Sequence, residues 1–212
     1  MLRDICFPPP PEVDLDDIKG FHYPLRISQQ EEITEREILK AVSRTSKDKA
    51  LGPDELPNRV IQIVVQRRTS LIRRLFQACL DQGVQPDHFK SAYTVMLKKP
   101  GKSDYTNPSA YRLIALLNTL RKVLEAVISN RIKFIAETHD LLSDTQYRAR
   151  TNRATETALQ QITEKIHTIW GREGKRVASL LLLDVSKVFN RVSHVRLAHN
   201  LRKKRILESL VR

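Results

Sequence analysis

Residues 177–190, with the sequence VASLLLLDVSKVFN, decide how this chain is interpreted. The seven residues from 177 to 183 carry no charge, and Asp184 follows them directly. A short apolar run of this kind is typical of a buried strand, and a carboxylate at the end of such a strand lies at a sheet edge, where ligands often bind. A hard carboxylate oxygen suits Mg²⁺. The alternative is that Asp184 caps a helix or closes a strand at the surface.

The charge of the chain indicates a polyanionic partner. Its 212 residues are 41% hydrophobic, enough for one substantial core or two small ones. Lys and Arg number 37 against 24 Asp and Glu, which gives a net charge of +13. This excess predicts binding to nucleic acid with an affinity that falls steeply as salt is added. The alternative is a basic surface without a partner.

The two cysteines, Cys6 and Cys79, form neither a disulfide framework nor a metal cluster and indicate a reducing compartment. No apolar run approaches the length that spans a membrane. The N-terminal sequence MLRDICFPPPPEVDLDD lacks the apolar core of a signal peptide. We therefore expect an intracellular protein, nuclear or cytoplasmic, with no membrane partner.

Local signals predict three helices in the first half of the chain. Thr34 and Glu37 form a capping box that begins a helix ending before Gly52-Pro53. Its apolar face is Ile38, Ala41 and Val42. Pro57 opens a second helix, with Val60, Ile61, Val64 and Val65 as its apolar residues. A third helix carries Ile72, Leu75, Phe76, Cys79 and Leu80 at helical spacing and ends at Gly83, so we interpret Cys79 as a core residue.

The sequence of the second half also predicts mainly helices. Residues 91–102 predict a strand that runs into a basic turn. Thr119 is expected to cap a long helix, with one apolar face formed by Leu120, Val123, Leu124, Val127, Ile128 and Ile135. A helix over residues 154–170 should turn Ala158, Leu159, Ile162, Ile166 and Ile169 inward. The strand that ends at Asp184 follows, and then a basic helix with Leu197, Leu201 and the run 202–205. The predicted fold class is α/β (α+β), mainly helical.

Four blocks in order resemble the reverse transcriptase of non-LTR retrotransposons, of the jockey-like and Tad-like group. They are ITEREILKAVSRTSKDKALGPDELPNRV (33–60), HFKSAYTVMLKKPGKSDYTNPSAYRLIALLNTLRKVLEAVISNRI (88–132), LLSDTQYRARTNRATETAL (141–159) and GKRVASLLLLDVSKVFNRVSHVRLAHNLRKKRI (174–206). The FPPPP run and the acidic EVDLDD that follows it predict a flexible Pro-rich and acidic linker over residues 1–32. The resemblance begins near residue 33 and implies a helical N-terminal extension over 33–90. Residues 91–212 then correspond to the fingers and a truncated palm.

The resemblance also implies roles for individual residues. Asp184 matches the first catalytic aspartate, which binds both Mg²⁺ ions of the two-metal mechanism, and the carbonyl of Val185 matches a second metal contact. Phe189 matches the aromatic residue under the sugar of the incoming deoxynucleoside triphosphate. Lys98 or Lys99, together with Arg112, matches the residues that hold the triphosphate. Three further residues match contacts to the RNA template, the DNA primer or their hybrid: Gln146, Arg150 and Arg153.

Each basic group has a plainer alternative. Lys98, Lys99 and Lys102 could form an ordinary solvated turn, and Arg150 and Arg153 could be surface charges near the start of a helix.

The sequence departs from the family pattern in the palm. The family supplies its other catalytic carboxylates from a downstream Tyr-x-Asp-Asp hairpin, but Glu208 is the single acidic residue after Asp184. The only Asp-Asp pair, Asp16-Asp17, lies in the N-terminal segment. Asp184 cannot hold two Mg²⁺ ions by itself, without the other carboxylates. We therefore expect a truncated and catalytically inactive reverse transcriptase fragment.

Other motif positions differ as well. The expected Arg-Pro-Ile reads RLI at 112–114, and the expected Gln-Phe-Gly-x-Arg-Pro reads QYRART at 146–151. Lys187-Val188 replaces a small Gly-Ala pair, and Asn190 replaces an acid. These changes weaken the expectation of nucleotide binding.

Two alternative hypotheses follow. A non-catalytic nucleic-acid-binding protein would use the basic residues of 186–212, eight Lys or Arg against one acid. A chain without independent function would aggregate through the uncovered palm strand.

Overall fold

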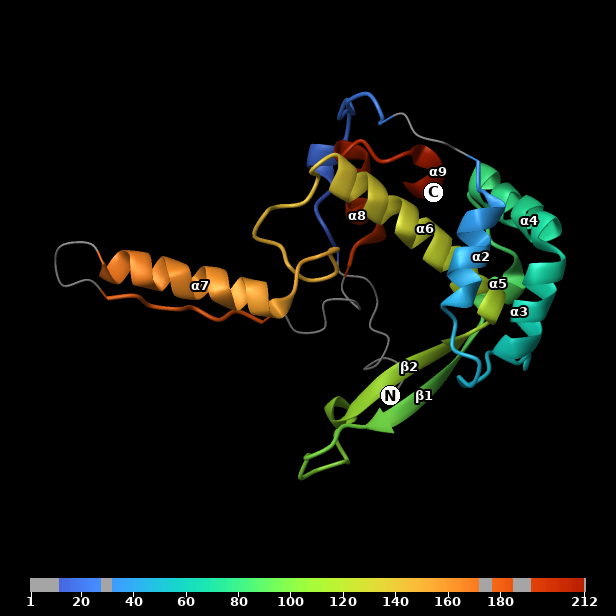
Figure 1. Ribbon diagram of the computed structural model, residues 1–212, viewed down its shortest axis with the longest axis horizontal. Coiled ribbons are helices and arrows are strands. Elements are labelled where there is room, and N and C mark those ends of the chain that lie inside the picture. The colour runs from blue at the N-terminus through green and yellow to red at the C-terminus, as the bar shows by residue number, and fades with distance from the viewer. Residues whose placement is uncertain (1–11, 28–31, 172–176, 185–191, 212) are drawn as a thin grey trace. The chain divides into compact units, whose positions relative to one another are not determined.

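The computed structural model describes residues 12–27, 32–171, 177–184 and 192–211 (Figure 1). The chain divides into two compact units, the first formed by residues 1–132 and 189–212 and the second by residues 133–188. The described residues contain eight α-helices and one two-stranded sheet, so the predicted mainly helical mixed fold is confirmed. Among the described helices, none combines the length and the apolar character needed to cross a membrane.

The first predicted helix, α2 (Glu35–Ser43), forms as the capping box requires. The Thr34 hydroxyl accepts from the Glu37 amide at 3.3 Å, and the Glu37 carboxylate accepts from the Thr34 amide at 2.8 Å. The predicted apolar face of α2 is buried, and the helix ends well before residue 52.

The next two helices are also present, but α3 is less buried than predicted. In α3 (Asn58–Arg67), Ile61 and Val65 are buried whereas Val60 and Val64 are more than 40% exposed. In α4 (Thr69–Gln82), the predicted stripe is buried except for Leu75, which is 36% exposed. Gly83 ends α4 in the left-handed conformation with a φ of 65°. Cys79 is a core residue as predicted, and burial raises the pKa of its thiol.

The core of the first unit forms where these three helices meet the first part of α6 (Thr119–Thr138) and the short helix α5 (Asp87–Lys90). Figure 1 shows α2, α3 and α4 gathered along α6. The predicted apolar face of α6 supplies the buried residues Val123, Leu124 and Val127. Phe76 and Phe89 provide the aromatic part of this core.

A buried ion pair joins α2 to α6. The Arg131 guanidinium, 8% exposed, donates from Nε to Glu37 Oε1 at 2.7 Å and from Nη2 to Oε2 at 2.9 Å. Burial alone would raise the pKa of the Glu37 carboxyl, but the bonds from Arg131 and Thr34 outweigh it and lower the pKa. A bidentate pair of this kind fixes the geometry of both partners.

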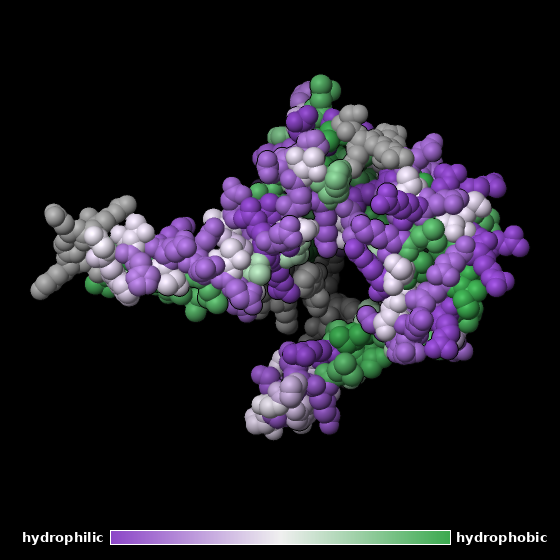
Figure 2. All heavy atoms as spheres, in the orientation of Figure 1, coloured by the Kyte–Doolittle hydropathy of each residue, from purple (hydrophilic) through white to green (hydrophobic). Residues whose placement is uncertain are grey.

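Strands β1 (Ala92–Lys98) and β2 (Tyr111–Leu117) form an antiparallel hairpin that extends away from the helices (Figure 1). This confirms the strand predicted within residues 91–102. Every residue of β1 is exposed, and Figure 2 shows hydrophobic residues on the part of the hairpin nearest the helices and hydrophilic residues at its far end. The exposed apolar residues include Val95, Met96, Leu97 and Ile114.

A buried polar junction holds the base of the hairpin. A Cβ on the buried Gly52 would lie 2.6 Å from the Asn118 backbone nitrogen, so the Gly-Pro-Asp turn packs directly on the link between β2 and α6. Asn118 accepts from the Asp54 amide at 3.2 Å and donates to the His88 carbonyl at 2.7 Å. The Thr119 hydroxyl, predicted to cap α6, donates to the Asn58 side chain.

In the second unit, α7 (Thr155–Trp170) is present, but its predicted inward face is not buried. Leu159 is 60% exposed and Ile162 is 38% exposed. The expectation that this stripe enters a core was wrong. The described part of this unit comprises α7, the end of α6, a loop and one extended segment, which are too few elements to enclose a helix face.

The strand predicted to end at Asp184 is also not formed. Residues 177–184 have no strand assignment, and Leu180, Leu181, Leu182 and Leu183 are 62–82% exposed. A strand needs a hydrogen-bonded neighbour, and among the described residues only β1 and β2 pair with each other. An apolar run without a neighbouring strand therefore remains extended and unpaired.

The predicted basic helix is α8 (His194–Lys203), which Ser193 caps by accepting from the Arg196 amide. A turn leads from it to α9 (Glu208–Val211), and the turn residues Ile206 and Leu207 are buried. Near the start of the chain, the 3₁₀ helix η1 (Asp16–Ile18) contacts α8 through Asp17 and Arg196. A second 3₁₀ helix, η2 (Pro108–Ala110), leads into β2.

We predict that Gly52→Ala destabilises the first unit by about 1–3 kcal/mol, because the added methyl group must displace backbone atoms of the β2–α6 link. Urea unfolding measures this change. Gly171→Ala is the control, since its new Cβ would meet its nearest atom at 3.3 Å, at the end of an exposed helix. Equal stability of the Gly52 variant and the wild type would contradict the close approach.

Candidate nucleic-acid interface

The register of the hairpin separates the predicted phosphate-binding residues into two faces. Leu97 pairs with Arg112 and Lys98 pairs with Tyr111, so Arg112 and Lys98 point to opposite faces. The bond from the Lys99 amide to the Ala110 carbonyl at 2.8 Å extends the same register by one pair. Lys99 therefore shares a face with Arg112, and of the two lysines it is the one that the hairpin places with the arginine.

Neighbouring groups hold both lysines. The Lys98 ammonium lies 5.1 Å from the centre of the Tyr105 ring, and the Lys99 ammonium donates to the Ser109 carbonyl at 2.8 Å. The Tyr105 hydroxyl donates to the Lys99 carbonyl at 2.9 Å. Lys98 and Arg112 remain exposed. The end of the hairpin is thus an ordered basic surface, not only a set of solvated chains.

The second group of predicted residues lies in the loop before α7. The Arg150 side chain is 4% exposed and donates to both carboxylate oxygens of Glu137, with Nη2 at 2.7 Å from Oε2. It also donates to the Ser143 carbonyl at 2.9 Å. This hydrogen bonding lowers the pKa of Glu137 and raises that of Arg150. Arg150 therefore ties the loop to the end of α6.

Arg153 and Gln146 occupy more open positions in the same loop. Arg153 pairs with Asp144 at 2.9 Å, and its guanidinium lies 5.8 Å from the Tyr147 ring centre. Gln146 is exposed. The Tyr147 hydroxyl is buried without a hydrogen-bond partner within the described ranges.

The loop adopts left-handed backbone conformations at residues other than the expected glycine position. Ala149 has a φ of 64° and Asn152 a φ of 58°. The glycine of the family pattern corresponds to Arg148, one residue earlier. A residue with a Cβ costs about 1–2 kcal/mol relative to glycine in this conformation, so Ala149 adds strain to the loop backbone.

Asp184 is exposed at the end of the extended segment. Val185 and Phe189 lie outside the described residues, as do Lys187, Val188 and Asn190. Within the described ranges, no group of three His, Cys, Asp or Glu side chains comes together in a way that could hold a metal ion. The described residues therefore do not fit a pair of Mg²⁺ ions, because one exposed carboxylate leaves most of their ligand positions unfilled.

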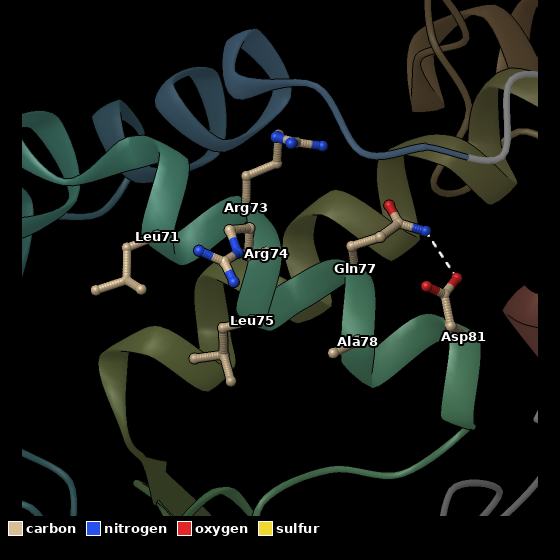
Figure 3. A pocket seen from close by; sticks show the side chains of 7 residues that line it. All are labelled: Leu71, Arg73, Arg74, Leu75, Gln77, Ala78 and Asp81. Atoms are coloured by element: carbon tan, nitrogen blue, oxygen red, sulfur yellow. Dashed lines mark hydrogen bonds between the residues drawn. The ribbon is translucent and has the colours of Figure 1, made fainter.

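A pocket of about 590 Å³ on the outer face of α4 contains none of the predicted site residues. Figure 3 shows that seven side chains of this one helix line it, among them Arg73, Arg74 and Leu75. The amide of Gln77 donates to Asp81 across its edge at 2.8 Å. Because a single helix forms it, the pocket is an open surface and not an enclosed site.

Comparison with known proteins identifies the family. Residues 97–211 match the model of the reverse transcriptase (RNA-dependent DNA polymerase) family. The chain belongs to the reverse transcriptase family. The match begins at the end of β1, so it includes Lys98, Lys99 and Arg112 on the hairpin as well as the loop with Arg150.

Three of the relatives are named as polymerases of Drosophila melanogaster mobile elements. The probable RNA-directed DNA polymerase from transposon X-element is 30% identical over 159 residues, 75% of this chain and 17% of that protein. The probable enzyme from transposon BS is 28% identical over 79% of the chain and 18% of its own length. The polymerase from mobile element jockey is 28% identical over 76% and 17%. The chain thus spans less than a fifth of these relatives, and the matched regions are long enough to include part of the sequence before residue 97.

Several residues that order this reverse transcriptase surface were not singled out from the sequence. Tyr105 and Ser109 position the two lysines, and Glu137 holds Arg150. Their partners lie 6–13 residues away in the sequence, at separations where no periodic pattern indicates a contact. The rings of Tyr105 and Tyr111 pack with their centroids 6.1 Å apart. The spacing of these two tyrosines is the one sequence signal that could have indicated an ordered turn.

We predict that the pKa of the Glu137 carboxyl lies below its ordinary value of 4.5 and returns toward it in Arg150→Gln. Arg153→Gln, which removes only a distant charge, should change the pKa less. Carbon-detected NMR titration of the carboxyl measures both.

Because folding lowers the pKa of Glu137, the ion pair between Glu137 and Arg150 stabilises the folded state fully above pH 4.5. This stabilisation is lost as the pH falls through the pKa that Glu137 has in the folded state. Equal pKa values in the wild type and the Arg150 variant would contradict the observed pairing.

Proposed function

We propose that this chain is the fingers and the first part of the palm of a non-LTR retrotransposon reverse transcriptase of the jockey-like group. Residues 33–90 form the helical extension that precedes the polymerase, and residues 1–32 form a linker, part of which contacts α8 and the turn after it. The observation that carries this proposal is the family match over residues 97–211, supported by the relatives from mobile elements. The activity of the parent enzyme is RNA-templated DNA synthesis.

The basic end of the hairpin contacts the phosphates of nucleic acid or of a deoxynucleoside triphosphate. Lys99 and Arg112 share one face, and Arg112 is exposed. Guanidinium offers a planar bidentate fork to phosphate, and ammonium offers a compact charge. The macromolecular partners are an RNA template, a DNA primer and their hybrid. Gln146 and Arg153 act on the same partners, and Arg150, buried and paired with Glu137, orders the loop that carries them.

These 212 residues do not polymerise by themselves. When bound in a complete palm, two Mg²⁺ ions would stabilise charge on the attacking and leaving oxygens of phosphoryl transfer. Asp184, the carbonyl of Val185 and the sugar-binding Phe189 are the residues of this chain assigned to that chemistry. The sequence contains no Tyr-x-Asp-Asp motif, and its one Asp-Asp pair lies at residues 16 and 17. A single aspartate does not hold both ions.

A second function, non-catalytic nucleic-acid binding, is favoured by the charge distribution. The net charge is +13, and α8 with the following turn carries the uninterrupted basic run 202–205. Binding of this kind requires neither metal nor triphosphate. Both proposals therefore predict salt-dependent binding, and the two differ in whether the hairpin takes part.

We predict that the chain binds an RNA–DNA hybrid and that Arg112→Gln lowers the slope of log affinity against log salt by about 0.7–0.9. Fluorescence anisotropy over a salt series measures the slope. Arg74→Gln is the matched control, because it removes the same charge from an exposed position outside the family match. Equal slopes for the two variants would remove the hairpin from the interface and leave only the second function.

We also predict that the purified chain adds no deoxynucleotide to a primed RNA template in the presence of Mg²⁺. A gel-based extension assay with labelled primer tests this. Extension that disappears in Asp184→Asn would refute the proposed inactivity and would show that Asp184 has catalytic partners.

A further inference from the structure

Residues 14–27 run along the basic helix α8 and the turn that follows it. Contacts occur at both ends of the helix and in its middle, and all of them lie within the first unit. The segment contains three acidic residues between positions 14 and 17, whereas α8 and its turn carry five arginine or lysine residues between positions 196 and 205. An acidic segment thus covers part of a basic surface.

The acidic end of this segment binds Arg196. The Arg196 guanidinium donates to Asp17 Oδ2 at 2.6 Å and to Oδ1 at 2.7 Å, and Nη2 also donates to the Asp14 carbonyl at 2.5 Å. These bonds lower the pKa of Asp17 and raise that of Arg196. The carboxylate therefore takes the planar bidentate position on Arg196 that a phosphate group would also take.

The middle of the segment covers the next turns of α8 with aromatic rings. The Tyr23 hydroxyl lies 2.9 Å from His199 Nδ1, and the Phe21 ring packs on His199 with centroids 5.0 Å apart. His199 is 4% exposed as a result. The Lys203 ammonium lies 5.9 Å from the Phe21 ring centre.

The far end of the segment is held by backbone bonds to the turn after α8. The Ile27 amide donates to the Arg205 carbonyl at 3.0 Å, and Arg205 Nε donates to the Leu25 carbonyl at 2.7 Å. Arg26 and Arg202 share the Glu208 carboxylate. The backbone contacts anchor the segment here, so the acidic end can detach while the chain stays nearby.

The pair between Asp17 and Arg196 is accessible to a competitor. The Asp17 side chain is 62% exposed and the Arg196 side chain 29% exposed, so water and salt screen their attraction. A nucleic acid strand presents many phosphates to the same helix. Its binding also releases counterions from the strand, which favours the complex. Arg196 and Lys203 are two helical turns apart, so they lie on one side of α8.

We propose that the side of α8 formed by Arg196 and Lys203 binds the phosphate backbone of nucleic acid, and that residues 14–23 mask it until nucleic acid displaces them. This inference rests on the proposed nucleic-acid binding and adds a second contact surface, away from the hairpin, with a built-in competitor. In the absence of nucleic acid, the Asp17 carboxylate occupies the position on Arg196 that a phosphate group would take.

The test compares Asp17→Asn with Asp16→Asn. Both variants remove one negative charge from η1, but the Asp16 carboxylate pairs with Lys19 at the surface, whereas Asp17 binds Arg196. Binding of an RNA–DNA hybrid is measured by anisotropy over a salt series. Asp17→Asn should bind about threefold to tenfold more tightly than Asp16→Asn at low salt, because only the Asp16 variant must still break the pair between Asp17 and Arg196. This difference should shrink as salt is added, because salt screens that pair.

The Arg196→Gln background provides the specificity control, because adding Asp17→Asn to it should change the affinity no more than adding Asp16→Asn does. Equal affinities and slopes for Asp17→Asn and Asp16→Asn would overturn the masking proposal and leave the proposed function standing. Failure of the wild type and both variants to bind the hybrid at any salt concentration would overturn the proposed function, and the masking proposal with it.

A measurement on the wild type keeps the proposal testable if Asp17→Asn does not fold. Displacement predicts that a saturating hybrid speeds hydrogen exchange of the backbone amides of residues 16–21, including the Lys19 amide that donates to the Asp16 carbonyl. Unchanged or slower exchange in these residues would overturn the proposal. The amide of Phe89, which donates to the Pro86 carbonyl, serves as the internal reference away from α8.

Discussion

The close approach of Gly52 to Asn118 is the contact on which the arrangement of the first unit depends. No side chain fits between the Gly-Pro-Asp turn and the link from β2 to α6, because a Cβ would lie 2.6 Å from backbone atoms. The buried Asn118 side chain then accepts from Asp54 and donates to His88, so its polar atoms are paired inside the protein. The contact joins the helices before residue 90 to the segment that matches the reverse transcriptase family.

This junction explains why an exposed hairpin can present a defined surface. Two isolated strands are marginally stable in water, but here the end of β2 continues into a helix whose first turns are buried. The opposite end of the hairpin is ordered by Tyr105 and Ser109, which hold the two lysines. The register then places Lys99 and Arg112 on one face. A polar junction at one end and local bonds at the other thus position the groups assigned to phosphate binding.

Elements with complete local signals were predictable from the sequence. The Thr34 capping box, the Gly83 terminus of α4 and the strand at residues 92–98 depend on neighbours a few residues away, and each formed where expected. The burial of α7 and the pairing of residues 177–184 depend on elements distant in sequence, and both predictions were wrong. Side chains such as Asn118 and Glu137 find partners that no periodic pattern specifies. The roles assigned to Asp184 and Phe189 came from resemblance, since the residues themselves indicate only a carboxylate after an apolar run.

The most direct test of the proposed function is to map where nucleic acid touches the protein. An RNA–DNA hybrid with photoreactive bases would be crosslinked to the purified chain at moderate salt, and the modified peptides identified by mass spectrometry. The account predicts crosslinks in the hairpin peptides between residues 93 and 112, where the exposed Lys98 lies by the partly buried rings of Tyr105 and Tyr111. Crosslinks confined to the outer face of α4, around Arg73 and Arg74, would contradict it, because that surface lies outside the family match.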